Sequence, residues 1–326
     1  AAEHPEFRFL QAEDEIASAN AVIGGPLYAS AYAAARKAGL LEKRVFFAFM
    51  PALETGDEGS RAWRFFTSRR DQIDAIVNFS TDTLGIRSFG AFHPTDQYSL
   101  RMTDLFESAL REKGLSLEKA AYNSADSGSW PEAAARLIRP EQREGSGTPI
   151  PNTAFEALFL PGVWKHVPHI TTSLLYNGED RLVLLGTNPW EQSLSGKTLP
   201  DADRYLLTVF PGAWDPARAP KTLRAPGWDA SGVAHQKLYL FQPAATGIKP
   251  LDVSDFRRVR AAVRQRAALR MQGLPAVDEQ GQPLVEGLPP TPEQPAPAPA
   301  SAQPAAGGIG TTPLPSYKLR LPSGAQ

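Results

Sequence analysis

Alternating strand-like and helix-like segments are the feature that most limits the folds open to this chain of 326 residues. Runs of β-branched and aromatic residues at 43–51, 86–94 and 155–162 predict buried strands, while 96–114 and 166–178 have the apolar spacing of helices. Strand and helix pairs of about thirty residues are typical of βαβ units, in which helices cover a parallel sheet. The sequence therefore predicts an α/β fold with helices on both faces of the sheet.

Composition excludes several classes of site and partner. The chain has no cysteine, so it can form no disulfide, thiolate nucleophile or cysteine metal site. Its formal net charge is -1, with both signs interspersed, which gives no electrostatic footprint for nucleic acid. No apolar run is long enough for a transmembrane helix, and the first residues lack a signal peptide pattern. A membrane tether through an N-terminal signal or lipid anchor removed before Ala1 stays open.

The carboxyl-terminal part changes in character. A basic helix is expected over 252–273, and its arginines offer either a partner surface or a solvated face whose stems cover Val259, Val263 and Leu269. A Pro- and Ala-rich stretch follows, whose composition cannot bury enough apolar surface to order itself. The last residues alternate enough to predict one final strand.

Side chains with site chemistry are few. His166 and His169 are three apart, a spacing that can share a metal on a helix, but Pro168 lies between them and no acidic residue is adjacent. We expect no metal and no cofactor. No motif of a nucleophile elbow, phosphate loop or dinucleotide fingerprint is present, so we expect no enzyme. An enzyme using Glu54 and His93 is the rival hypothesis.

Five stretches in order, "AVIGGPLYASAYAAARKAGL", "RAWRFFTSRRDQ", "RSFGAFHPTDQYSLRMTDLFESALREKG", "FEALFLPG" and "RLVLLGTNPW", resemble the type I periplasmic binding protein superfamily. The sequences of the last two stretches are similar to those of penicillin-binding protein activators and of substrate-binding proteins of branched-chain amino acid ABC transporters. The resemblance implies a two-lobed α/β fold with parallel sheets flanked by helices and an incomplete first lobe. The expected divisions are a partial first lobe (1–67), a second lobe (68–208), a return segment to the first lobe (209–283), a disordered tail (284–316) and a possible final strand (317–326).

The resemblance also implies ligand-binding positions in a cleft between the lobes. In amino-acid binders of this family a hydroxyl residue in the opening turn takes the ligand carboxylate, and Ser30 stands near that place, after the turn Gly24–Pro26. That turn could equally serve only to start a helix, because its glycines and proline suit helix entry. The other ligand-binding positions implied are Glu54, Tyr98, Trp164 and Asn188. Glu54 and Asn188 depart from the family pattern, so an α-amino acid would not find its usual partners.

These patterns favour a non-enzymatic, exported ligand-binding or regulatory domain that resembles penicillin-binding protein activators. The alternative is a solute-binding subunit of an ABC transporter for amino acids or amides. The expected location is the periplasm or cell envelope. The expected partner is either a small polar ligand in the interlobe cleft or another protein of the envelope, with no nucleic acid.

Overall fold

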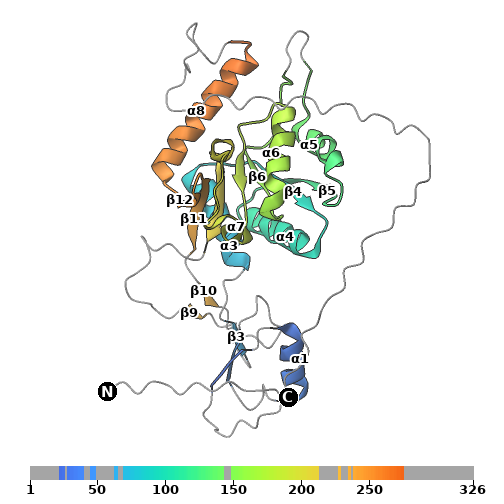
Figure 1. The fold of residues 1–326 in the computed structure, drawn as a ribbon, viewed down its shortest axis with the longest axis vertical. Coiled ribbons are helices and arrows are strands. Elements are labelled where there is room, and N and C mark those ends of the chain that lie inside the picture. Colours follow the sequence, from blue (N-terminus) through green and yellow to red (C-terminus); the bar gives the residue numbers. More distant parts are fainter. Residues whose placement is uncertain are drawn as a thin grey trace, which may run out of the picture. The chain divides into compact units, whose positions relative to one another are not determined.

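The structure is a computed structural model (Figure 1), and the residues that it describes are 22–25, 28–39, 45–48, 62–64, 69–142, 148–212, 227–228, 234–235 and 238–274. These residues form a seven-stranded sheet with helices on both faces, a three-stranded sheet and a two-stranded pair. Each is described by itself below. The α/β class expected from the alternating pattern is confirmed.

The large sheet has the strand order β12-β11-β8-β7-β6-β4-β5. Its strands are β4 (Phe89–Pro94), β5 (Leu117–Tyr122), β6 (Ala157–Phe159), β7 (Val183–Leu185), β8 (Thr208–Gly212), β11 (Tyr239–Ala244) and β12 (Gly247–Pro250). The five strands from β5 to β8 are parallel, whereas β11 runs antiparallel to both β8 and β12. The carboxyl ends of the parallel strands therefore share one edge of the sheet.

Helices cover both faces of this sheet. They are α3 (Arg69–Asn78), α4 (Gln97–Glu112), α5 (Trp130–Ile138), α6 (Val167–Tyr176), α7 (Pro189–Leu194) and α8 (Val253–Met271), with a π-helical turn after α3 at Phe79–Thr83. One apolar core contains side chains of α3, α4 and α8, and the other contains side chains of α5, α6 and α7. The sheet thus separates two cores, as expected for a doubly wound α/β unit.

The strands supply side chains to the two cores in strict alternation. Ala157 and Phe159 of β6 lie in the core of α3, α4 and α8, whereas Leu158 lies in the other. The same alternation occurs in β7, where Leu184 faces away from its two neighbours. Successive side chains of a strand point to opposite faces, so a strand buried on both sides must be apolar throughout. This is why the strand segments read as continuous apolar runs.

The direction of winding reverses beside β4. The chain passes from β4 through α4 to β5 on one side, and then through α5 to β6, which pairs with the other side of β4. Because parallel crossovers are right-handed, the reversal moves the following helices to the opposite face. The boundary between β4 and β6 is therefore the topological switch point of the sheet.

Helix α8 is held to the large sheet by both apolar and ionic contacts (Figure 1). Val259 and Val263 are buried in the core. Arg260 and Arg264 both pair with Glu156, which precedes β6. Val259 and Val263 are thus covered by the core of the large sheet, and the head groups of Arg260 and Arg264 pair within the same unit. A partner surface at the other arginines stays a prediction.

The expected return of residues 209–283 to the first lobe differs from the structure. Within the described residues 238–274, β11 and β12 extend the large sheet, and α8 packs on it. The expected boundary after 208 also falls inside β8. The reason is the burial of apolar side chains, because Phe241 and Phe256 bury 97–99% of their surface in the cores of this sheet. The lobe division at 67 and 68 stays a prediction, and 284–326 lie outside the described residues.

The amino-terminal segments form a smaller parallel sheet of order β1-β2-β3, from β1 (Val22–Gly24), β2 (Val45–Ala48) and β3 (Ala62–Arg64), with helix α1 (Ala29–Lys37). The backbone N–H of Gly25 donates to the carbonyl of Phe47 at 2.9 Å. Gly25 has a φ of 125°, which favours glycine. This N–H serves the sheet, which supports the structural interpretation of the turn. Separately, β9 (Gly227–Trp228) pairs antiparallel with β10 (Ala234–His235).

Candidate binding cleft

A cleft of about 510 Å³ opens at the carboxyl edge of the large sheet, beside the switch point between β4 and β6. Ligand sites of open α/β sheets form at this position, because the loops on either side diverge there. Residues that follow β4, β5, β6 and β7 line it: Pro94, Asp96, Tyr98, Ser99, Ser124, Ala125, Pro161, Gly162, Val163, Lys165, His166 and Pro189. The cleft is therefore built from connections that the sheet holds together.

Asp96 fixes the start of α4 at the cleft. Its side chain accepts a hydrogen bond from the backbone N–H of Ser99 at 2.9 Å, as an N-cap residue does. Burial alone would raise the pKa of Asp96, but the hydrogen bonds from Ser99 prevail and lower it. The carboxylate is thus ionised and serves the helix.

Tyr98 stands in the first turn of the same helix. The guanidinium carbon of Arg69 lies 5.6 Å from the centre of its ring, a cation–π contact. Burial raises the pKa of Tyr98, against smaller opposing effects of Thr187 and Arg69. The phenol is therefore neutral near pH 7.

A buried aromatic group supports the opposite wall. The Tyr122 hydroxyl lies 3.0 Å from Nδ1 of His166, and the indole of Trp130 meets both rings at centroid distances of 4.7 and 5.1 Å. Burial lowers the pKa of His166, as do Lys165 and His169, while Asp96 acts in the opposite sense. Burial also raises the pKa of Tyr122, so its hydroxyl keeps its proton.

Gly162 lets this wall approach the sheet closely. A Cβ added at Gly162 would lie 2.8 Å from the Tyr122 hydroxyl, so glycine leaves room for it. The Gly162 carbonyl accepts a hydrogen bond from Nε1 of Trp190 at 2.7 Å. The next residue, Val163, is 46% exposed. The wall consequently combines a fixed backbone with an accessible apolar side chain.

Two of the expected site residues take internal positions. Trp164 is only 8% exposed and packs against Trp190 and Tyr205 at centroid distances of 5.2 and 5.0 Å. The Asn188 amide donates to Glu191 at 2.9 Å and to the Pro211 carbonyl at 3.5 Å. Neither is among the residues that line the cleft.

The remaining expected site residues lie in different parts of the chain. Tyr98 lines the cleft, Ser30 is exposed on α1 beside the small sheet, and Glu54 lies outside the described residues. His93 is 8% exposed, and its Nδ1 donates to the Pro94 carbonyl at 3.0 Å. The interlobe site that would join these positions stays a prediction.

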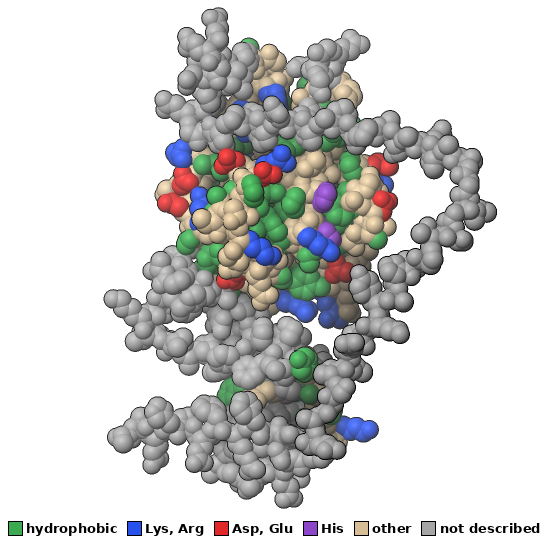
Figure 2. Space-filling model, in the orientation of Figure 1, with side chains coloured by type: hydrophobic (Ala, Val, Ile, Leu, Met, Phe, Trp, Pro, Cys, Tyr) green, Lys and Arg blue, Asp and Glu red, His purple; other side chains and the backbone are tan. Residues whose placement is uncertain are grey.

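Sequence reasoning missed Asp96, Lys165 and His166 as cleft residues. An aspartate directly before an amphipathic helix is an N-cap signal, and it marks Asp96. His166 and His169 were considered only for metal binding. The described ranges contain no group of three or more potential metal ligands, and none of their helices could cross a membrane. On the face shown in Figure 2, acidic and basic side chains are interspersed, with histidines among hydrophobic side chains.

No family model matches the sequence, and no curated protein matches it. Solved structures do. The C-domain of LpoA from Haemophilus influenzae, a regulator of PBP1A, is 12% identical with a TM-score of 0.51, over 71% of this chain and 82% of that one. Full-length LpoA from the same organism gives 0.52 at 10% identity, over 71% of this chain and 48% of that protein.

An ABC transporter substrate-binding protein from Desulfitobacterium hafniense is 10% identical with a TM-score of 0.50, over 71% of this chain and 80% of that protein. At such identities the similarity establishes the fold, and what each relative binds is a property of that relative. The order of the strands, the cores on both faces and these matches lead to one conclusion. The chain has the α/β fold of the type I periplasmic binding proteins.

Proposed function

We propose that this protein is a non-enzymatic, exported regulatory protein of the cell envelope that acts by protein contact through the cleft beside β4 and β6. On this proposal it resembles LpoA, and its partner is a penicillin-binding protein of the PBP1A kind. One observation carries the choice. Trp164 and Asn188, which an amino-acid site would need in the cleft, are held by internal contacts instead.

The accessible surface at the cleft supports contact with a protein. Val163, which lines the cleft, is one of the large apolar side chains that are exposed in the described part of the chain. Lys165 also lines the cleft and is exposed. Exposed apolar side chains with a charged neighbour are common in protein interfaces, where a few buried anchors carry most of the affinity.

The polar groups of the cleft do not support catalysis. Asp96 caps α4, and Nδ1 of His166 is bonded to Tyr122. Four serine hydroxyls of the described residues donate to backbone carbonyls, that of Ser173 to the carbonyl of His169, and none of the four bonds to a histidine ring. A nucleophile, a base and an orienting group would have to be in mutual reach, and this arrangement does not provide them.

The test is binding of the full chain to the PBP1A-type enzyme of its own organism, measured by biolayer interferometry. Val163→Asp should weaken binding about tenfold or more, because it places a charge in the desolvated contact. Leu274→Asp is the matched control, since Leu274 is 50% exposed and does not line the cleft. Absence of binding, or equal loss in both variants, would contradict the proposal.

The alternative, a solute-binding subunit for amino acids or amides, is favoured by one observation. The cleft volume of about 510 Å³ is within the range of small-molecule sites. Thermal melting against amino acids and amides tests this. A rise in melting temperature that Tyr98→Ala abolishes and Tyr176→Ala preserves would establish the alternative, and an unchanged melting temperature with every ligand would remove it.

A further inference from the structure

The described part of the large sheet ends on one side in a strand with an unpaired edge (Figure 1). Strand β5 is hydrogen-bonded to β4, and no described strand pairs with its other side. Along such a strand, alternate residues direct their N–H and C=O groups to the neighbouring strand, and the residues between direct theirs outward. The outer edge of β5 therefore presents a row of backbone donors and acceptors to which another chain can add.

A groove of about 470 Å³ lies beside this edge. Residues 118–121 of β5 line it together with Arg136, Leu137 and Arg139 from the end of α5. None of these residues lines the cleft, so the groove is a separate surface. Several peptide-binding domains accept an added strand at such an edge, where backbone hydrogen bonds give affinity and neighbouring pockets give specificity.

The charged side chains of β5 leave its edge open. Charged residues on an edge strand usually protect it from further pairing. Here Lys119 donates to Glu107 of α4 at 2.8 Å, and Glu118 accepts from Arg139 at 2.7 Å. Because α4 and α5 cover opposite faces of the sheet, these contacts draw both side chains over the faces and away from the edge. The two alanines that follow, 120–121, are too short to cover it.

Arg139 takes its position at a cost in backbone energy. It is the one non-glycine residue with a positive φ, 52°, in the part of the chain that the structure describes. It ends α5, where glycine is common, and a side chain in this conformation is disfavoured by about 1 kcal/mol. Strain of this kind indicates that the side chain is used. Arg139 holds Glu118 and adds a positive charge to the groove.

The charges that line the groove are mostly positive. Lys119, Arg136 and Arg139 stand against one acid, Glu118. Lys119 and Arg139 have the carboxylate partners given above, whereas Arg136 is exposed and forms no ion pair with another described residue. Glu132, the acid one turn earlier on α5, does not line the groove. A carboxylate brought in by a partner would therefore find Arg136 available.

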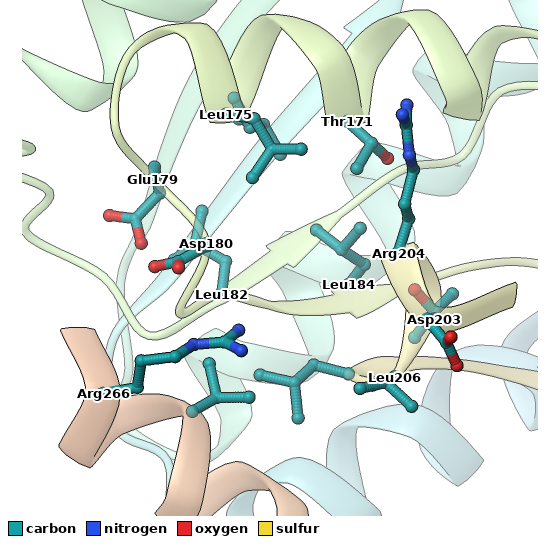
Figure 3. A pocket seen from close by; sticks show the side chains of 14 residues that line it. Thr171, Leu175, Glu179, Asp180, Leu182, Leu184, Asp203, Arg204, Leu206 and Arg266 are labelled. Atoms are coloured by element: carbon teal, nitrogen blue, oxygen red, sulfur yellow. The ribbon is translucent and has the colours of Figure 1, made fainter. Parts of the chain in front are cut away.

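The pocket at the amino-terminal edge of the sheet is too small for a chain segment (Figure 3). Its walls come from α6, from the residues that precede β7, from the start of β8 and from α8. Its free volume is about 60 Å³, roughly twice the share of one water molecule in the liquid. The groove beside β5 is several times larger, so it has room for the side chains of an added strand.

We propose that the outer edge of β5 binds an extended acidic segment of another protein, which adds to the large sheet as a further strand. Successive side chains of a strand point to opposite faces, so acidic residues at alternate positions of that segment lie on the side of α5, opposite Arg136. The backbone ladder supplies affinity, and the charges select an acidic partner. This surface goes beyond the proposed function, which acts through the cleft.

The test is binding of the full chain to a fluorescein-labelled peptide of ten residues that alternates glutamate with valine, measured by fluorescence anisotropy. A Kd of about 0.1 mM or tighter is expected. The same peptide with lysine for every glutamate should bind at least about tenfold more weakly. A peptide with proline at its two central positions should do so too, because proline cannot donate to a ladder. Equal binding of the three peptides, or no binding, would overturn the proposal.

Two variants and a map of the contact sharpen the test. Arg136→Glu should weaken peptide binding about tenfold or more. Arg101→Glu is the matched control, because Arg101 is exposed on α4, changes the net charge equally and does not line the groove. It should leave the affinity unchanged.

The amide NMR signals of residues 118–121 should shift saturably with the peptide. Equal loss of affinity in both variants, or shifts confined to the cleft, would contradict the proposal. A dimer of the free protein in which the amides of 118–121 are protected from hydrogen exchange would assign the edge to a second copy of this chain and would also overturn it.

Discussion

Tyr122 and His166 are joined by a hydrogen bond of 3.0 Å that ties the end of β5 to the first turn before α6. The two residues are 44 positions apart in the sequence. His166 lines the cleft, Tyr122 supports it from behind, and Trp130 packs on both of their rings. The geometry of the cleft therefore depends on a contact between two loops that neighbouring strands bring together.

Removal of this hydrogen bond should destabilise the protein. Tyr122→Phe deletes a buried hydroxyl and leaves Nδ1 of His166 without this partner. The free energy of unfolding should fall by about 1 kcal/mol, which lowers the melting temperature by roughly 2–4 °C for a unit of this size. Differential scanning calorimetry measures it. Tyr176→Phe, at an exposed tyrosine, is the control and should change nothing.

The same contact predicts a pH dependence of stability. Burial, Lys165 and His169 lower the pKa of His166 below its ordinary value of 6.5. In the pH range between the two values, the unfolded chain binds more protons than the folded protein, so stability rises with pH. The contribution is complete above pH 6.5 and declines as the pH falls toward the folded-state pKa.

Urea unfolding between pH 5 and 7.5 should show this decline, and His166→Gln should reduce it. His169→Gln, at an exposed histidine on the next turn, should preserve most of it. An NMR titration of His166 checks the cause directly. A folded-state pKa above 6.5 would reverse the expected sign and refute the prediction.

The ionic attachment of α8 gives a third prediction. Asp180 is 6% exposed in its side chain and pairs with Arg270 through both oxygens, so Asp180→Asn should destabilise the protein by about 3 kcal/mol. Arg258→Gln on the same helix is the control. Its pair with Asp255 is exposed, and its loss should cost at most about 0.5 kcal/mol. Comparable losses in guanidinium chloride unfolding would show that the buried pair has no special role.

Two glycines separate backbone strain from steric clash. Gly178 and Gly114 have φ values of 78° and 73°, so alanine is strained at both. At Gly178 a Cβ would also lie 2.0 Å from the Pro149 carbonyl oxygen, whereas at Gly114 nothing lies within 4 Å. Gly114→Ala should cost about 1 kcal/mol and Gly178→Ala at least about 2 kcal/mol more. Equal melting temperatures would contradict this difference.

Much of the large sheet could be predicted from the sequence, because its strands are buried on both faces and read as apolar runs. Strand β5 could not. Its segment, Leu117–Tyr122, contains Glu118, Lys119 and two alanines, which are better helix formers, and it pairs only on one side. Pairing with β4 decides its conformation.

The site was harder to predict than the fold. Tyr98, Trp164 and Asn188 were all assigned through the resemblance, by position along the chain; Tyr98 lines the cleft, and its role in binding stays a prediction. A position does not reveal which way a side chain points, and packing against Trp190 and bonding to Glu191 turn Trp164 and Asn188 inward. The pairing of Tyr122 with His166 had no local signal, since the residues meet only through the sheet.

The central claim, that the cleft beside β4 and β6 is the working surface, is tested most directly by hydrogen–deuterium exchange. The full chain should be compared alone and mixed with the PBP1A-type enzyme of its organism. The account predicts protection of segments 94–99 and 161–166, with no change at 179–182 on the opposite edge of the sheet. Unchanged exchange at 94–99 and 161–166, with protection elsewhere or nowhere, would contradict it.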